Sequence, residues 1–173
     1  SVDYNAFDPI PFEDQQGHLW LAFGSFWSGL KLIRLNADGE RDGADLYALS
    51  TRSNTAVEAP HLHYAGGFYY LFESVDACCQ GAASTYKVFV GRSQSVTGPY
   101  VDRDGKQLLD GGGTLVLQGD QRWRGPGHNA VLVDAGRTLN VYHSYDANSD
   151  GLPTLRISEM SFDDAGWPVS AGP

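Results

Sequence analysis

Basic residues are scarce in this sequence: 12 Lys and Arg stand against 21 Asp and Glu, a formal net charge of −9 over 173 residues. Nucleic-acid binding needs clustered Lys and Arg, so we expect no nucleic-acid partner. No apolar run approaches the roughly 20 residues of a membrane-spanning helix, so we expect no membrane insertion. Ser1 does not begin a signal peptide, and the compartment is not encoded in these residues. The acidic balance fits a neutral ligand, and it fits plain solubility equally well.

Cysteine is also scarce, and its two occurrences, Cys78 and Cys79, are adjacent. Neighbouring Cα atoms lie about 3.8 Å apart, which is below the usual separation of disulfide-bonded residues. A bridge between them would therefore be strained. We expect two free thiols, whose presence does not identify the compartment.

Long helix-forming runs are few, whereas 21 Gly and 8 Pro indicate many turns. Three similar units follow one another along the chain. Each contains a strand-like stretch that ends in serine: HLWLAFGS at Ser25, FYYLFES at Ser74 and TLNVYHS at Ser144. A variable loop and another strand come next: LKLIRL, KVFVGRS and TLRISEM. Turn residues and an outer strand are expected around NADGERDG, TGPYVDRDG and FDDAGWPV.

Antiparallel four-stranded units repeated at this length are typical of β-propeller blades, with an ordinary β-sandwich as the alternative. We place the units at about 4–53, 54–112 and 113–173 of a single all-β domain. Propellers typically close with four to eight blades, so three would leave sheet faces and edges uncovered. We expect a homo-oligomer, with a dimer favoured. A partner or a longer polypeptide that supplies the missing blades is the other route.

In each unit, one titratable residue precedes the expected innermost strand: Asp8 in the first, Glu58 in the second and His128 in the third. The innermost strands of a propeller begin near its central axis, so these side chains are expected to converge on one funnel. Convergence of this kind is hard to explain by packing alone. Pro9 and Pro60 lack an N–H group and suit the start of a strand.

A set of short motifs runs through nearly the whole chain in a fixed order: YNAFDP, GSFWSG, VEAP, CCQGAASTYKVFVGRS, TGPY, RGPGHNAV, VYHSYD and PTLRIS. Together they resemble glycoside hydrolase family 43, and most closely its endo-α-1,5-L-arabinanases. The resemblance implies a five-bladed β-propeller whose central cavity hydrolyses arabinan with inversion of configuration, in an extracellular enzyme. The chain resembles blades three to five of that fold.

The resemblance also implies roles for individual residues. Glu58 resembles the general acid, Asp8 the carboxylate that tunes this acid, and His128 a histidine near a central calcium ion or its waters. The stretches that contact the sugar correspond to Asn5, Ala6, Phe7, Asp8, Ser25, Phe26 and Trp27. The family's general base, an aspartate in the first blade, has no counterpart here.

Inverting hydrolysis needs an acid on the leaving oxygen and a base on the opposite face, about 6.5–9.5 Å away. Partial burial and the like charge of Asp8 are expected to favour the protonated form of Glu58. Because no base is visible, a non-catalytic carbohydrate-binding module and an assembly fragment without a ligand remain alternatives. Endo and exo action, and arabinan and xylan side-chain substrates, are not distinguished. Ordinary structural roles are also open: a solvated loop end for Glu58, an Asx turn for Asp8, and packing for Phe26 and Trp27.

Other polar and aromatic residues receive simpler interpretations. His61 and His63 share a strand face, and we expect them to pack between blades rather than bind metal. Trp123 fits a sugar platform or a filler between blades. Asp146, Asn148 and Asp150 alternate as in a calcium loop, but the terminal Glu of that motif is lacking, so we expect a polar turn.

Overall fold

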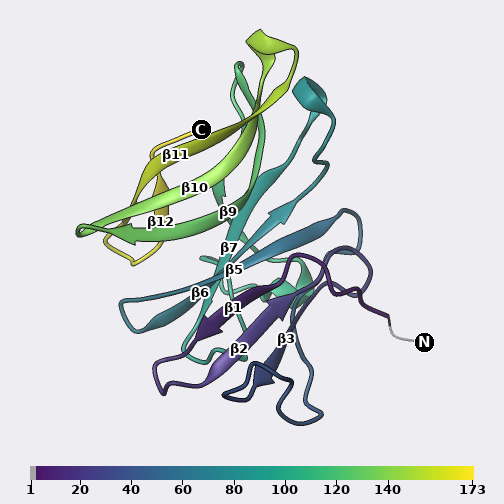
Figure 1. The fold of residues 1–173 in the computed structure, drawn as a ribbon. Helices are drawn as coiled ribbons and strands as arrows, with labels where there is room; N and C mark the ends of the chain where they lie inside the picture. The colour runs from purple at the N-terminus through teal and green to yellow at the C-terminus, as the bar shows by residue number, and fades with distance from the viewer. Residues whose placement is uncertain (1–2) are drawn as a thin grey trace.

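The structure, a computed structural model, describes residues 3–173 as three antiparallel sheets of four strands each, in chain order (Figure 1). The first blade consists of β1 (Ile10–Glu13), β2 (Leu19–Phe23), β3 (Leu30–Leu35) and β4 (Tyr47–Ser50). The second consists of β5 (Val57–Ala65), β6 (Phe68–Val75), β7 (Lys87–Ser93) and β8 (Thr114–Leu117). The third consists of β9 (Trp123–Asp134), β10 (Arg137–Asp146), β11 (Leu152–Phe162) and β12 (Pro168–Ser170). The prediction of three four-stranded blades is confirmed.

The outer strand of the second blade differs from the prediction. We expected it around TGPYVDRDG and the end of the unit at 112, but β8 follows at Thr114–Leu117 and pairs with β7. Between them the chain makes an excursion that includes the short 3-10 helix η2 (Leu108–Asp110). This excursion buries Leu108 completely in the core between the first two blades. Val101 keeps one isolated bridge to Arg92, so the predicted segment reaches the sheet edge without becoming its outer strand.

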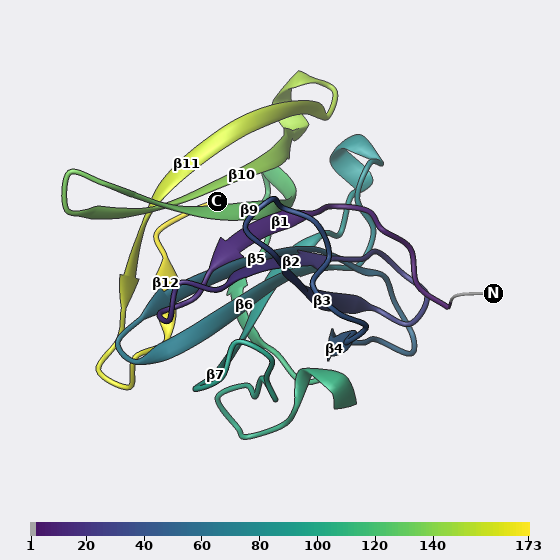
Figure 2. The same ribbon diagram turned by 60° about the horizontal axis from the view of Figure 1, so that its bottom comes forward.

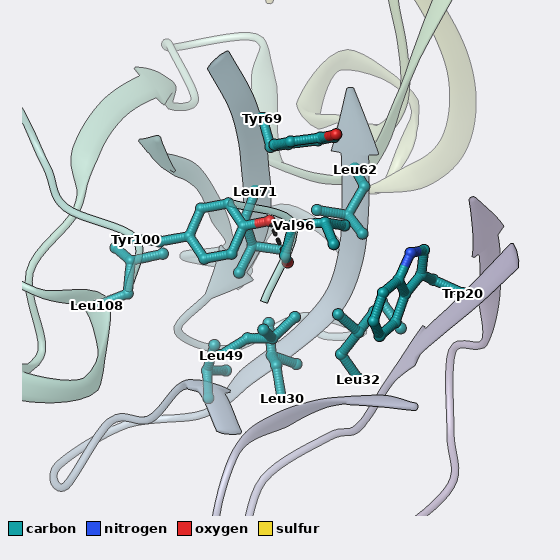
Figure 3. Close-up of a cluster of buried hydrophobic side chains, with 12 residues drawn as sticks. Trp20, Leu30, Leu32, Leu49, Leu62, Tyr69, Leu71, Val96, Tyr100 and Leu108 are labelled. Carbon is teal, nitrogen blue, oxygen red and sulfur yellow. Dashed lines mark hydrogen bonds between the residues drawn. The ribbon is translucent and has the colours of Figure 1, made fainter. Parts of the chain in front are cut away.

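Alternating apolar side chains hold successive blades together. Between the first and second blades, Trp20 and Leu32 pack with Leu62 and Tyr69 (Figure 3). Between the second and third blades, the buried cluster includes Tyr70, Phe72, Val88, Val90, Leu117, Tyr142, Met160 and Trp167. Such burial contributes roughly 25 cal/mol per Å² of apolar surface, so these two clusters stabilise the packing of successive blades.

The third blade leaves one sheet face without a neighbouring sheet (Figure 2). Leu132, Leu155 and Ile157 lie on this side and expose 48, 69 and 57% of their surface. The register places Ile157 opposite Val141 and Leu155 opposite His143, so these residues share one face of β10 and β11. Exposed apolar side chains gathered on one sheet face are typical of an interaction surface.

In the part of the chain that the structure describes, helical structure is limited to three single-turn 3-10 segments: η1 (Gly81–Ala83), η2 and η3 (Ala147–Ser149). No helix within residues 3–173 has the length and apolar character needed to span a membrane.

Candidate active site

Each inner strand has one non-glycine residue with left-handed backbone, either in the strand or just before it. Asp8 (φ 54°), Ala59 (φ 51°) and His128 (φ 50°) are these residues, and none of them is glycine. Asp8 precedes β1, whereas Glu58 and His128 lie inside β5 and β9, where the strand pairing shifts register. The expectation that all three titratable residues precede their strands is therefore wrong for Glu58 and His128. A bulge re-aims the side chains around it, and strained backbone of this kind is common at functional sites.

The three serines that end the repeated strand stretches bind inner strands. The Ser25 hydroxyl donates to Oε2 of Glu58 in the next blade at 2.8 Å. The Ser74 hydroxyl accepts a hydrogen bond from the backbone N–H of His128, also in the next blade, at 2.8 Å. The Ser144 hydroxyl donates to the Arg124 carbonyl of its own blade at 2.8 Å. The repeated serine thus links the first two blades to the strand that carries the next candidate residue.

Tyr86 holds the second oxygen of the Glu58 carboxylate. Its hydroxyl donates to Oε1 at 2.7 Å, and burial together with the Glu58 charge raises the pKa of Tyr86 well above its ordinary value. The phenol therefore stays protonated and remains a donor at neutral pH. The ring packs directly over Gly127, where an added Cβ would lie 2.0 Å from a Tyr86 ring carbon. Position 127 must therefore stay glycine for Tyr86 to reach Glu58.

Asp8 and Asn5, which precede the first strand, bind backbone groups of Ala59 and Ser25. The backbone N–H of Ala59 donates to Oδ2 of Asp8 at 3.0 Å, which places this carboxylate beside the residue that follows Glu58. Asn5 and Ser25 are joined by two hydrogen bonds, at 2.5 and 2.8 Å. Asn5 therefore positions Ser25, which in turn contacts Glu58. These contacts bring Asp8, Ser25 and Glu58 together, while their roles in catalysis and sugar binding stay predictions.

Phe26 and Glu58 line one pocket of about 360 Å³. Its walls come from the loop after β2, the start of β5 and the loop after β6, and consist of Phe26, Thr55, Ala56, Glu58, Asp76, Ala77, Cys78 and Gln80. Within this pocket, the Lys87 ammonium pairs with Asp76 at 2.7 Å and the Thr55 hydroxyl donates to it at 2.9 Å. The Asp76 carboxylate is thus held in place by two hydrogen bonds and lines the same pocket as Glu58.

The remaining predicted sugar contacts are exposed but do not line this pocket. Phe7 and Trp27 expose 65 and 66% of their surface, and Ala6 is also exposed. Both Phe26 (φ 56°) and Trp27 (φ 42°) have left-handed backbone, which projects two aromatic rings from one tight turn. Their roles as sugar platforms stay predictions.

The prediction of free thiols at Cys78 and Cys79 is wrong, because the two residues form a disulfide. The turn that contains them places left-handed backbone at Asp76 (φ 75°) and Cys79 (φ 67°). Such backbone is uncommon outside glycine, and it allows two adjacent side chains to point the same way. The Cα atoms of the two residues lie 3.8 Å apart, so in this local conformation a short Cα separation does not prevent the bond.

His128 is exposed, whereas the nearby His143 is half-buried. The His143 ring stacks on Tyr86 with centroids 5.8 Å apart, and its buried Nε2 has no hydrogen-bond partner within residues 3–173. Burial, followed by the neighbouring His128, lowers the pKa of His143, while the Glu58 charge opposes this shift. His143 is therefore neutral at pH 7.

The metal expectation fits these residues poorly. Over the described range 3–173, no three His, Cys, Asp or Glu side chains are grouped so as to hold an ion. Calcium prefers six to eight oxygen ligands, whereas His128 offers a single imidazole nitrogen. These residues alone do not form a calcium cage.

Three structural interpretations can be compared with the contacts. His61 accepts a hydrogen bond from the Val131 N–H of the third blade at 2.9 Å, so its packing role is confirmed. His63 stacks on Phe162 of the same blade with centroids 6.3 Å apart, which confirms its packing role too. Asp146 accepts from the N–H of Asn148 at 3.0 Å and forms the predicted polar turn.

Trp123 packs against two arginine side chains, and its interpretation as a filler between blades stays a prediction. The guanidinium carbons of Arg122 and Arg156, both from the third blade, lie 4.6 and 3.9 Å from its ring centroid. Its alternative role as a sugar platform stays a prediction.

The sequence and the structure of this chain are both similar to those of known proteins. The family model described as "Glycosyl hydrolases family 43" matches residues 1–168. The extracellular endo-α-(1→5)-L-arabinanase 1 of Bacillus subtilis (strain 168) is 46% identical over 170 residues, which cover 97% of this chain and 51% of the relative. The chain therefore spans about half the length of that curated relative.

Solved structures agree. An exo-1,5-α-L-arabinanase from a bovine ruminal metagenomic library has a TM-score of 0.95 and 39% identity, covering 98% of this chain and 58% of its own. The Cellvibrio cellulosa α-L-arabinanase, solved with arabinohexaose, has a TM-score of 0.92 and 38% identity, covering 98% and 59%.

Sequence reasoning missed three parts of the site: Tyr86, His143 and the disulfide. Tyr86 directly precedes the strand KVFVGRS, and His143 lies within VYHSYD, so both fall in stretches that mainly predict strands. The local signal was weak: Tyr86 directly precedes the first residue of a strand, and His143 directly precedes Ser144.

Proposed function

This chain belongs to glycoside hydrolase family 43, and from that premise we propose that it carries the acid side of a site that hydrolyses α-1,5-linked L-arabinan. The observation that carries the proposal is the Glu58 carboxyl, held on one oxygen by Ser25 and on the other by Tyr86. Relatives named as arabinanases, one of them solved with arabinohexaose, support the substrate class.

The contacts suit a proton donor. Tyr86 donates to Glu58 in either protonation state, because its own pKa is raised by burial and by the Glu58 charge. The Ser25 hydroxyl can donate to the carboxylate or accept a hydrogen bond from the protonated acid, so it can follow the proton. Glu58 is thus oriented before and after it protonates the leaving oxygen. General acid catalysis of this kind contributes about 10²–10⁴-fold.

The general base lies, in this proposal, on blades beyond the three of this chain. Asp8 and Asp76 are the two carboxylates found near Glu58, and both are engaged: Asp8 with the Ala59 N–H, and Asp76 with Lys87 and Thr55. Asp8 keeps its proposed role as the carboxylate that tunes Glu58. An inverting reaction requires a further carboxylate about 6.5–9.5 Å from the acid, on the other face of the sugar.

The fold suggests how the site is completed. The three blades form part of the five-bladed arabinanase propeller, and the chain covers 58% of one solved relative, close to three blades in five. Blades set at five-fold spacing leave room for two more rather than three. A partner or further segment that supplies two blades therefore fits better than a closed ring of two copies, although an open homo-oligomer remains a proposal. Its apolar contact surface would include Leu155 and Ile157.

Calcium near His128 stays a proposal that needs oxygen ligands from outside these three blades, and an extracellular location stays a proposal as well. The location is supported by the curated relative, which is named as extracellular. No step of the proposed mechanism passes through a metal, because the described residues do not form a cage for one.

The second candidate is a carbohydrate-binding propeller without catalysis, which the engaged state of Asp8 and Asp76 favours. One experiment separates the two: the solution mass of the chain, together with release of reducing ends from linear arabinan and binding of arabinotriose. Hydrolysis that Glu58→Gln removes supports the enzyme. Binding without hydrolysis in every assembly supports the binding module, and the absence of both refutes the proposal.

A further inference from the structure

The Cys78–Cys79 disulfide lies at the edge of the candidate active site. Cys78 is half-buried and lines the pocket that contains Glu58 and Phe26, while Cys79 is exposed. The loop that carries the disulfide lies beside the loop joining β10 to β11 (Figures 1 and 2), and an added Cβ at Gly151 would lie 2.4 Å from the Ala82 nitrogen. The disulfide is therefore held between the second and third blades at the mouth of the cleft.

This disulfide cannot stabilise the fold in the usual way. A disulfide restricts the unfolded chain in proportion to the loop that it closes, and a bridge between adjacent residues closes almost none. It joins no two separate elements, since Cys78 and Cys79 belong to the same turn. Its effect is confined to the shape of that turn and to the surface that the two sulfurs present.

Several hydrogen bonds couple the turn to Glu58. The backbone N–H of Cys79 donates to the Tyr145 hydroxyl of the third blade at 2.9 Å. The Ala77 carbonyl accepts from the backbone N–H groups of Thr85 and Tyr86 at 2.9 and 3.1 Å. Since the Tyr86 hydroxyl donates to Glu58, the turn that holds the disulfide also fixes the residue that orients the acid.

The pocket has the surfaces that a furanose ring needs. Two bonded sulfurs form a polarizable surface without strong hydrogen-bond donors, comparable to the thioether of methionine. Phe26, from the preceding blade, adds an aromatic surface to the same pocket, and Asp76 adds a fixed acceptor for hydroxyl groups. The volume of about 360 Å³ falls in the range of small-molecule sites.

We propose that the Cys78–Cys79 disulfide is a sugar-contacting wall of the cleft, which packs against one arabinofuranosyl residue next to the bond that Glu58 protonates. This inference rests on the proposed function, because it assumes that the cleft binds arabino-oligosaccharide. It adds a specificity surface formed by the disulfide and Phe26, separate from the residues that hold the acid.

The test measures binding of α-1,5-linked arabinotriose to the whole chain by calorimetry or NMR titration. The Cys78→Ser/Cys79→Ser double variant is expected to bind about tenfold more weakly, the order of one well-packed contact. Ala83→Ser, an exposed position in the adjacent η1, is the matched control and is expected to bind like wild type. Phe26→Ala tests the other apolar surface of the same pocket and is expected to weaken binding as well.

Reduction gives a second way to open the bridge if the double variant does not fold. A small dithiol transfers two electrons: its own thiols join as a cyclic disulfide, and the Cys78–Cys79 bond is cleaved to two thiols. The same loss of affinity is expected, with recovery on reoxidation. Wild-type affinity in the folded double variant, or in the reduced chain where that variant fails to fold, overturns the inference. Failure of the wild-type chain to bind arabinotriose overturns both the inference and the proposed function.

Discussion

The interface between the second and third blades contains a histidine that must stay neutral. Nε2 of His61 accepts the hydrogen bond from the Val131 N–H, and this is impossible for a protonated ring, in which both nitrogens are donors. Burial, followed by the charge of His63, lowers the pKa of His61 from 6.5 to about 4. We therefore predict that acidification weakens the packing of these two blades, and lowers the stability of the fold, through protonation of His61.

The sign and size follow from linkage. Well above pH 6.5, His61 is neutral in both the folded and the unfolded chain and does not change the free energy of unfolding. As the pH falls from 6.5 toward 4, the unfolded chain takes up a proton that the folded chain does not, so the folded state is destabilised. At pH 5 the unfolded chain binds a proton at His61 almost fully, whereas about a tenth of the folded chains do. The free energy of unfolding is thereby reduced by about 2 kcal/mol between pH 7 and pH 5, because pH 5 lies about 1.5 units below the unfolded pKa of 6.5 and each unit costs about 1.36 kcal/mol. For a domain of this size, that lowers the melting temperature by roughly 4–8 °C.

Thermal unfolding at pH 7 and pH 5 measures the effect. His63 and His143 also have lowered pKa values, so the wild-type loss includes contributions from them. His61→Gln isolates the residue, because its side-chain amide can accept the Val131 hydrogen bond but does not titrate. The variant is expected to lose about 2 kcal/mol less than wild type over this interval. An identical loss in both proteins would show that His61 does not govern this interface.

Three further predictions concern stability and assembly. Arg52→Gln leaves the fully buried Glu73 without its partner and is expected to cost about 3–5 kcal/mol in denaturant unfolding; Arg137→Gln, which breaks an exposed pair, is expected to cost less than about 1 kcal/mol, and equal losses would contradict the argument. Light scattering is expected to show assemblies larger than 18.8 kDa, and Leu155→Ser/Ile157→Ser to reduce them, whereas a monodisperse wild-type monomer would refute this use of the exposed face. Adding or chelating calcium is expected to leave the melting temperature of the chain unchanged, and a large increase with calcium would reveal a site that these residues do not show.

Much of the fold could be predicted because alternation and turn residues carry local information. The strand LKLIRL is β3 and KVFVGRS is β7, each with the predicted bounds, and the serine endings also coincide with the ends of strands or lie close to them. The convergence of Asp8 and Glu58 followed from the repeat, since equivalent positions in successive blades meet at the axis. These features depend on residues near one another in the sequence.

The errors arose where backbone conformation departs from the regular pattern. The left-handed residue Ala59 sets the bulge that turns Glu58 inward, and alanine gives no sequence signal for such a conformation. The disulfide forms in a turn with left-handed backbone at Cys79. The position of the outer strand β8 in the sequence follows from the excursion that buries Leu108 in the core before the chain returns to the sheet. Tyr86 reaches Glu58 because Gly127, 41 positions later, leaves space for its ring. Contacts of this range cannot be read from a single sequence without its fold.

The central claim, that Glu58 is the proton donor of an arabinan-cleaving site completed by two further blades, is tested by one assay on a chimera. The part of the Bacillus subtilis arabinanase that precedes its matched half is fused before residue 1, and reducing ends released from linear arabinan are measured for Glu58 and Glu58→Gln forms. With both forms folded and binding arabinotriose, we predict hydrolysis by the first and a loss of about 10²–10⁴-fold in the second. Equal hydrolysis by the two forms, or none by either, would contradict the account.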